Sequence, residues 1–217
     1  MLDLPRERWT LVHAVRAQAQ ELGERPFLTF HDGVTLTFGE LDRRSDCVAS
    51  ALARLGVRPR DRELALAQNS AAFLLATLGT HKRGAIYTPI NTELKGAFLE
   101  HQLRNADPSV VVVDDELRPA FDTVDVSGLA ASHTAVVGDP SSPAVPGTVG
   151  IPFADLLDGG ADPGSLVTPR SHDVCMFMYT SGTTGPPRAC SCHMATAISS
   201  GWASRGPSGS APRTATA

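Results

Sequence analysis

The amino-acid sequence predicts an α/β fold, in which helices flank a partial, mostly parallel sheet, and three observations support this. Between residues 58 and 114, short apolar runs alternate with longer segments of helical periodicity, which is typical of βαβ units. Residues 109–114 (SVVVVD) are β-branched and apolar, as expected for a parallel strand buried on both faces. A second apolar run, residues 174–179, leads into a loop rich in glycine and hydroxyl side chains.

Local signals mark the elements of the first 56 residues. Gly23 ends a segment with apolar residues at i, i+3 and i+4, and Asp32-Gly33 is a hairpin turn signal. Thr37 and Glu40 match a capping box at the start of a helix. The expected elements are an amphipathic helix at 9–22, a β-hairpin with strands at 25–30 and 34–38, and a helix at 38–55.

Glycine and proline also divide the region that follows. Gly84 ends one helical segment and Pro108 breaks another. The expected elements are strands at 63–67, 85–90 and 109–114, with helices at 71–83 and 92–105 between them. Residues 124–170 are less regular, with a strand expected at 134–137, a short helix at 153–157 and a linker at 159–170.

Composition excludes several classes of protein. The 217 residues are 42% hydrophobic and 19% charged, with a net charge of −4, which does not favour binding to nucleic acid or to an anionic membrane. No apolar run approaches the roughly 20 residues of a membrane span. The N-terminus carries acids and no apolar segment of a secretion signal. We therefore expect a cytoplasmic protein.

The four cysteines, Cys47, Cys175, Cys190 and Cys192, show no disulfide framework, which fits a reducing compartment. Cys190, Cys192 and His193 crowd together without a second cluster and match zinc spacings poorly, so no metal site is expected there. Residues 199–217 hold one tryptophan and no aliphatic side chain larger than alanine. The rest of this segment is mostly Ser, Gly, Pro, Arg and Thr. Such a segment buries too little surface to offset its ordering entropy, and we expect it to be disordered.

The loop after residue 179 carries the chemistry. Glycines let the backbone approach a ligand, and successive N–H groups beside hydroxyl donors form a concave site for an oxyanion. The loop is not a Walker A motif, because no lysine follows either glycine. The candidate ATP-phosphate-binding residues are Thr180, Ser181, Gly182, Thr183, Thr184, Gly185 and Arg188.

The string from Tyr179 to Arg188 resembles the Y-T-S-G-[ST]-T-G-x-P-K-G motif of AMP-forming adenylating enzymes, the superfamily of acyl-CoA synthetases. It departs where Arg188-Ala189 replaces Lys-Gly, and arginine keeps the positive charge. Residues 36–41 (LTFGEL) and 81–91 (HKRGAIYTPIN) are similar to two upstream motifs of the family. The resemblance spans about residues 9–188 and is strongest to the carnitine/crotonobetaine-type CoA ligases.

The resemblance implies a two-step reaction. A carboxylate attacks the α-phosphate of Mg²⁺-bound ATP to give an acyl-adenylate and pyrophosphate, and a thiol, usually CoA, then displaces AMP. Carried over by position, the seven candidate residues would hold the β- and γ-phosphates. His193 lies near a histidine that follows this loop in many members, although its spacing differs by about one residue.

The resemblance also implies that much of the family's active site is missing. No adenine motif, no later acid for Mg²⁺ or ribose and no C-terminal domain with a catalytic lysine is present. We expect residues 1–188 to be an incomplete AMP-binding N-terminal domain and residues 189–217 a low-complexity tail. We therefore expect a truncated acyl-CoA ligase of fatty acid metabolism that is inactive alone, and the sequence does not identify its acid substrate. The alternatives are a non-catalytic nucleotide- or phosphate-binding remnant, a partner of a complementary chain, or another class such as a small NTPase or a Rossmann oxidoreductase, which the absent motifs disfavour.

Overall fold

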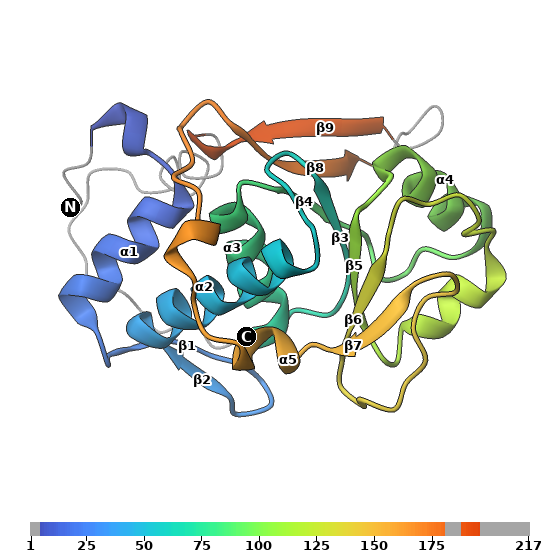
Figure 1. Ribbon diagram of the computed structural model, residues 1–217, viewed down its shortest axis with the longest axis horizontal. Helices are drawn as coiled ribbons and strands as arrows, with labels where there is room; N and C mark the ends of the chain where they lie inside the picture. Colours follow the sequence, from blue (N-terminus) through green and yellow to red (C-terminus); the bar gives the residue numbers. More distant parts are fainter. Residues whose placement is uncertain (1–4, 181–187, 196–217) are drawn as a thin grey trace.

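The computed structural model describes residues 5–180 and 188–195, which form a layered α/β structure (Figure 1). Its helices are α1 (Leu11–Leu22), α2 (Phe38–Arg54), α3 (Ala71–Arg83), α4 (Gly96–Ala106) and α5 (Asp155–Asp158), with 3-10 turns η1 (Arg6–Arg8), η2 (Arg118–Thr123) and η3 (Pro163–Ser165). Its strands are β1 (Pro26–Thr29), β2 (Thr35–Thr37), β3 (Arg62–Leu66), β4 (Ile86–Pro89), β5 (Val110–Asp114), β6 (His133–Val137), β7 (Val149–Pro152), β8 (Val174–Thr180) and β9 (Arg188–His193).

Seven of these strands form one sheet, in the order β7-β6-β5-β3-β4-β8-β9. Every neighbouring pair is parallel except β8 and β9, which run antiparallel. The strands β1 and β2 form a separate antiparallel hairpin. The predicted α/β fold with a mostly parallel sheet is therefore confirmed.

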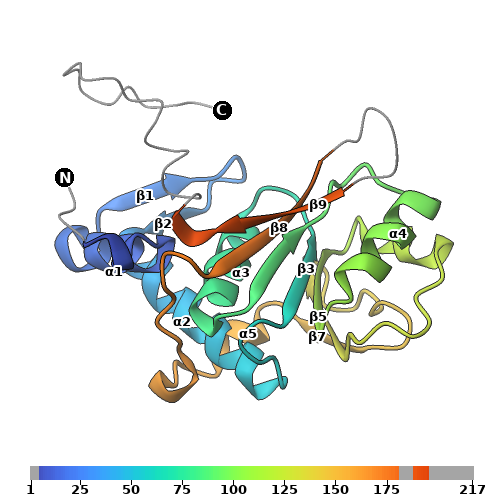
Figure 2. The ribbon, with the colours of Figure 1, turned by 90° about the horizontal axis from the view of Figure 1, so that it is seen from above.

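The two faces of the sheet are buried under different helices, with α2 and α3 on one face and α4 on the other (Figure 2). Because side chains alternate along a strand, the valines of β5 divide between the two cores. Val110 and Val112 pack with Leu75 and Leu78 of α3, whereas Val111 and Val113 pack with the α4 core. The β-branched run thus forms a strand buried on both faces, as its sequence predicts.

Most expected boundaries agree with the structure to within two residues, and the cap of α2 is the predicted one. The Thr37 side chain accepts from the backbone N–H of Glu40, and the Glu40 carboxylate accepts from that of Thr37. The start of the fourth helix was wrong, because α4 begins at Gly96 and not at Thr92. The Asn91 side chain accepts from the N–H of Glu93 instead, which holds residues 91–94 in a turn.

The C-terminal part of the described chain contains a strand that the sequence analysis assigned to the tail. Residues 189–193 belong to β9, which pairs along the length of β8 from Thr180 back to Val174. Residues 196–217, where we expect disorder, lie outside the described residues.

Helices α2 and α3 pack closely because α3 carries a glycine at their contact. A Cβ atom at position 79 would lie 2.5 Å from Cγ1 and 2.6 Å from Cβ of Val48 on α2. Real Cβ atoms do not approach other carbons so closely, so any side chain here would push the two helices apart. Gly79 therefore sets the distance between the helices that cover one face of the sheet.

We expect Gly79→Ala to lower the free energy of unfolding by about 1–3 kcal/mol, because overpacking outweighs the gain of about 1 kcal/mol in helix propensity. Urea denaturation of the two proteins measures this difference. The matched control places the substitution in a Val48→Gly background, where both of the Val48 atoms that a Cβ at position 79 would meet are absent and the cost should fall. An equal cost in both backgrounds would contradict this account of the contact.

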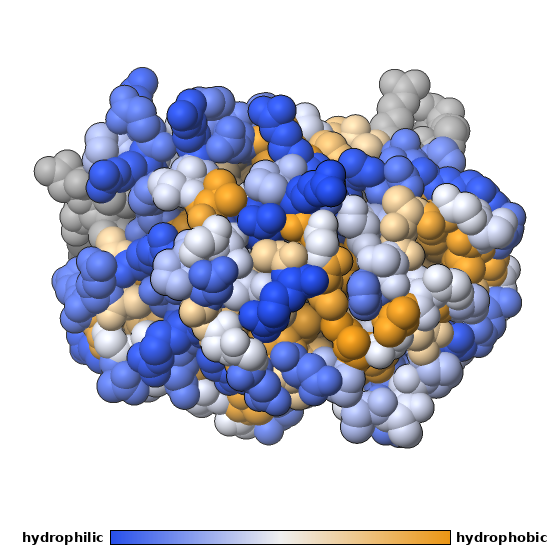
Figure 3. All heavy atoms as spheres, in the orientation of Figure 1, coloured by the Kyte–Doolittle hydropathy of each residue, from blue (hydrophilic) through white to orange (hydrophobic). Residues whose placement is uncertain are grey.

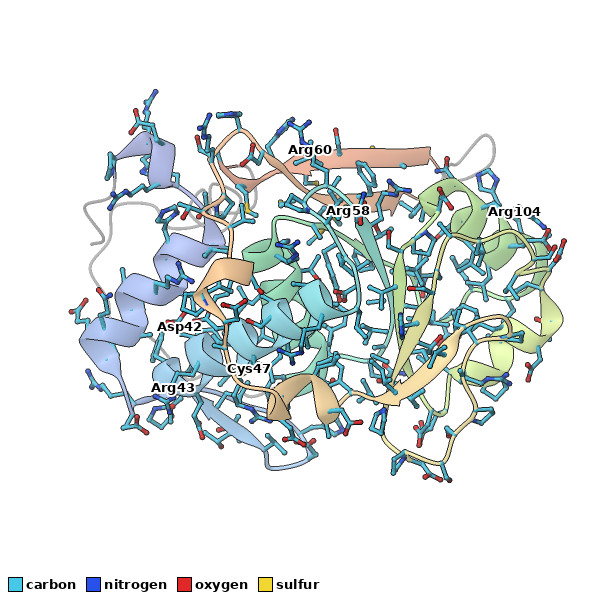
Figure 4. All side chains as sticks on the ribbon, in the orientation of Figure 1. Asp42, Arg43, Cys47, Arg58, Arg60 and Arg104 are labelled. Carbon is cyan, nitrogen blue, oxygen red and sulfur yellow. The ribbon has the colours of Figure 1, made fainter. Side chains whose placement is uncertain are left out.

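A buried ion-pair network joins the first three helices. The Lys82 side chain has no exposed surface, and its Nζ lies 2.6 Å from Oδ1 of Asp42 and 2.6 Å from Oδ1 of Asp46. Nζ also donates to the carbonyl oxygen of Asp42 at 2.7 Å, so the three donors of the ammonium are all used. Arg16 of α1 pairs with Asp46 at 3.3 Å. Figure 4 labels Asp42 on α2, at the centre of this network.

Lys82→Met should destabilise the fold by about 3–5 kcal/mol, because it leaves two largely buried carboxylates without their cation. Thermal or urea unfolding monitored by circular dichroism measures the loss. The control is Arg43→Met on the same helix, whose pair with Glu24 at 3.7 Å joins exposed side chains and should contribute less than about 1 kcal/mol. Similar losses of stability in the two variants would contradict the expectation that the buried ion pairs of Lys82 contribute more than the exposed pair of Arg43.

Candidate phosphate-binding loop at the carboxyl edge

The candidate site lies at the connection between β8 and β9. Thr180 is the last residue of β8 and Arg188 the first of β9, and the backbone register places them opposite each other. Residues 181–187 lie outside the described residues, and they contain the predicted site residues Ser181, Gly182, Thr183, Thr184 and Gly185. The structure thus brings the two ends of the predicted loop together, and the roles of the seven residues stay predictions.

The position of β8 in the sheet places this loop where α/β proteins bind ligands. Strand β8 runs parallel to β4, with Met176 opposite Tyr87. Strands β3, β4, β5 and β8 therefore end at the same edge of the sheet. Ligands of open α/β sheets bind at the carboxyl ends of the strands, and the loop that begins after Thr180 leaves from this edge.

The end of strand β8, directly before the loop, is fixed to α4 through Tyr179. The Tyr179 hydroxyl accepts from Nδ2 of Asn105 at 3.1 Å and donates to the carbonyl oxygen of Gln102 at 3.3 Å. Burial raises the pKa of this phenol, so it stays a neutral donor at physiological pH. The residue directly before the candidate loop is therefore held from a neighbouring helix.

The first half of β8 is fixed to α3 through His81. Its ring Nε2 lies 3.1 Å from the carbonyl oxygen of Cys175, so Nε2 carries the proton and donates it. Burial lowers the pKa of His81 to about 4, and the ring is therefore neutral at pH 7. Burial also raises the pKa of the Cys175 thiol to about 11, which keeps this cysteine a thiol rather than a nucleophilic thiolate.

His81 makes the stability of the fold depend on pH. Its pKa is near 6.5 in an unfolded chain and about 4 in the folded one, so the unfolded state binds more protons between these values. Stability should therefore fall by up to roughly 3 kcal/mol as the pH falls through this window. Urea denaturation at several pH values between 7 and 4.5 measures the change.

The control for this prediction is His81→Gln, whose amide can still donate to Cys175 but does not titrate. The stability advantage of the natural chain over this variant should shrink steadily as the pH falls. A constant difference across the range would contradict a neutral buried imidazole.

A second buried titratable group, Glu63 of β3, lies between the sheet and α3. Burial raises its pKa to about 8, so the carboxyl is largely protonated at neutral pH. Its Oε2 accepts a hydrogen bond from the Thr80 hydroxyl. Glu63 has no exposed surface and sits near the amino end of β3, away from the candidate loop. Its role is therefore in the core rather than in phosphate binding.

Sequence reasoning did not single out Tyr179, His81 or Glu63 as residues that matter to this region. Tyr179 and His81 were within the motif strings, but their partners come from helices that the sequence cannot place. The only signal available was that each is a polar side chain inside an apolar or helical segment, where buried polar groups need partners.

His193 lies at the wrong end of β8 to join the candidate loop. It pairs with Val174 in the register, six residues before Thr180, which is about 20 Å along a strand. Its Nδ1 is bonded to the carbonyl oxygen of His172 at 2.7 Å. In the ranges 5–180 and 188–195, no three His, Cys, Asp or Glu side chains come close enough to hold a metal ion.

One hollow of the described surface does not coincide with the candidate loop. It has a volume of about 600 Å³ and is lined by Arg60, Gly84, Val167 and Val174, among others. Gly84 lies just before the start of β4, and Val174 is the first residue of β8. This hollow therefore lies at the amino edge of the sheet. Because the loop leaves from the carboxyl edge, we do not assign this hollow to phosphate binding.

Comparison with known proteins decides the family. The family model described as AMP-binding enzyme matches residues 15–212. The chain belongs to the AMP-binding enzyme family. The chain is 32% identical over 158 residues to a feruloyl-CoA synthase of Amycolatopsis sp, covering 73% of this chain and 28% of the relative. It is 29% identical over 189 residues to a medium/long-chain fatty acid–CoA ligase of Mycobacterium tuberculosis, covering 87% of this chain and 30% of the relative.

Solved structures agree with this assignment. The anthranilate CoA ligase AuaEII in complex with anthranoyl-AMP matches with a TM-score of 0.77 and 27% identity, covering 89% of this chain and 36% of that one. ATP-bound MatB from Rhodopseudomonas palustris matches with a TM-score of 0.70 and 22% identity, which shows a shared fold. The chain therefore spans about a third of the length of the relatives it matches. Among the described residues, no helix combines the length and apolar character needed to cross a membrane.

Proposed function

We propose that this chain supplies the ATP-phosphate-binding part of an AMP-forming acyl-CoA ligase. In the proposed reaction, a carboxylate oxygen attacks the α-phosphate of ATP, pyrophosphate leaves, and the sulfur of CoA then displaces AMP to form a thioester. The observation that supports this most strongly is the placement of the two ends of the motif, Thr180 and Arg188, side by side at the carboxyl edge of the sheet.

The residues of the chain have electrostatic and positioning roles in this proposal. The N–H groups and hydroxyls between Thr180 and Gly185 would hold the β- and γ-phosphates, and the Arg188 guanidinium would offset their negative charge. Tyr179 and His81, which bind α4 and β8 respectively, would keep the strand before the loop in place. Chemistry at phosphorus of this kind depends on positioning and charge rather than on a covalent bond to the protein.

Mg²⁺ enters the proposal only as the partner of ATP. The described residues contain no group of three side chains that could hold the ion, so we place it on the nucleotide phosphates and derive no step through it. When bound there, Mg²⁺ neutralises phosphate charge.

The acid substrate is proposed only as a class. The relatives named above are ligases of aromatic and fatty acids, and the sequence motifs resemble the carnitine/crotonobetaine branch. We propose an organic carboxylate that is activated for transfer to CoA, in fatty-acid or related cytoplasmic metabolism.

We further propose that the isolated chain binds ATP without completing the reaction, since it spans about a third of its relatives. A second candidate function is a non-catalytic nucleotide-binding remnant, or one part of an enzyme completed by a separate chain. The lengths of the relatives favour these candidates over a self-sufficient ligase.

Binding of Mg²⁺-ATP to the chain, measured by isothermal titration calorimetry, tests the loop assignment. Arg188→Ala should weaken ATP binding by roughly tenfold, the loss expected for one charge-assisted contact. The control is Arg58→Ala, because Arg58 precedes the amino end of β3 at the opposite edge of the sheet (Figure 4). No ATP binding, or equal losses in the two variants, would contradict the proposal.

Pyrophosphate release with ATP and a panel of aromatic and aliphatic acids separates the candidate functions. We expect no release by the chain alone. Release by the chain alone would show that it is a complete enzyme and overturn the proposed incompleteness. Release that appears only when a polypeptide carrying the remaining family region is added would support a two-part ligase, and ATP binding with no release in either case would favour the remnant.

A further inference from the structure

A cavity of about 370 Å³ lies at the carboxyl ends of β6 and β7, apart from the candidate ATP loop. Its walls come from the β1–β2 hairpin, α2, the first turn of α3, and the segment from the end of β7 to α5. Figure 3 shows apolar side chains gathered over α5 and β7 in the lower centre of the molecule, beside these elements. Leu75, Val136 and Phe153 give the cavity a buried apolar lining.

One cation contributes to this otherwise apolar wall. Arg44 of α2 lines the cavity and is partly buried. Among the described residues it makes no ion pair and no hydrogen bond, although its charge helps to lower the pKa of Glu40 after the larger effect of the Thr37 hydrogen bonds. The Glu40 carboxylate is itself engaged in the capping box at the start of α2. Arg44 therefore has guanidinium donors available for a ligand.

The cavity also contacts the amino end of α3, a helix of 13 residues. The N-cap Ser70 side chain accepts from the N–H of Phe73. The N–H groups of Ala71 and Ala72, both of which line the cavity, have no partner in the described part of the chain. Unpaired N–H groups in the first turn of a helix attract anions, and the two alanines that carry them line the same cavity as Arg44.

We propose that this cavity binds a small carboxylate with an apolar body, as a site separate from the ATP loop. The carboxylate would lie between Arg44 and the N–H groups of Ala71 and Ala72, and the apolar body would contact Leu75 and Phe153. The volume is near the lower end of the ~300–1,000 Å³ usual for ligand sites, which fits a ring or a short chain. A neutral amide of the same shape has one acceptor oxygen and no charge, so it would pair with these donors less completely and more weakly.

The cavity is distinct from the proposed ATP site because of where the strands lie. Three strands, β5, β3 and β4, separate β6 from β8 in the sheet. At about 4.8 Å a step, the cavity is on the order of 19 Å from the strand that leads into the candidate loop. The two sites share no residue, so the failure of one proposal leaves the other intact.

The test is titration of the full 217-residue chain with benzoate, followed by amide chemical shifts, with benzamide as the neutral probe of equal shape. We expect benzoate to shift the amide signals of Ala71, Ala72 and Gly138, and benzamide to bind at least roughly tenfold more weakly. Inorganic phosphate is a third probe, which offers charge without an apolar body and should bind more weakly than benzoate.

Paired arginine variants on α2 complete the test. Arg44→Gln should weaken benzoate binding by roughly tenfold, whereas Arg43→Gln, at the neighbouring exposed position labelled in Figure 4, should leave it unchanged. Unchanged thermal midpoints would show that both variants fold. A cavity-filling Ala72→Leu variant should also reduce binding. Equal binding of benzoate and benzamide, equal effects of the two arginine variants, or shifts confined to residues near 180 and 188 would each overturn the proposal.

Discussion

The pairing of β8 with β4 is the constraint on which the candidate site depends. It is a contact between segments far apart in the sequence, and it alone brings the motif-bearing strand into the parallel sheet. Once β8 lies beside β4, the direction of every parallel strand fixes the edge at which its carboxyl end emerges. The same pairing leaves β9 to return antiparallel along β8, so that the two ends of the loop meet.

Neutral buried polar groups hold this pairing in place. His81 donates to a carbonyl of β8, and Tyr179 of β8 bonds to α4, so the strand is fixed from helices on both faces of the sheet. Burial moves the pKa values of both side chains in the direction that keeps them uncharged. Lys82 differs from these neutral groups, because its ammonium is buried in direct contact with two carboxylates that offset its charge. Each polar group is therefore either neutral or paired where solvent is excluded.

Local signals allowed much of the fold to be predicted from the sequence. The capping box of Thr37 and Glu40 and the terminal Gly84 each act within one turn of chain, and the structure contains both. The start of α4 was missed because the Asn91 side chain forms a turn that competes with the helix. Strands β7 and β9 were missed for a different reason. Their sequences, VGIP and RACSCH, have little strand character, and they become strands only by pairing with β6 and β8.

The candidate loop could be predicted because its glycines and hydroxyl side chains themselves indicate anion binding. The hydrogen bonds that hold the neighbouring strand in place could not be predicted. The hydrogen bond of His81 to Cys175 joins residues that only the crossover connections bring together. The cavity beside Arg44 likewise requires the hairpin, three helices and two strands to meet before it exists. Sequence patterns predict elements and motifs, but these features depend on distances between elements.

The order of strands in the sheet has a consequence for how the chain is made. Synthesis proceeds from the N-terminus, so β3 to β7 emerge from the ribosome before residue 174 does. The flank of β4 that receives β8 is therefore an open strand edge during that interval, with unpaired N–H and C=O groups. A nascent chain that pauses before residue 174 exposes this edge to other polypeptides, and the arrival of β8 and β9 covers it.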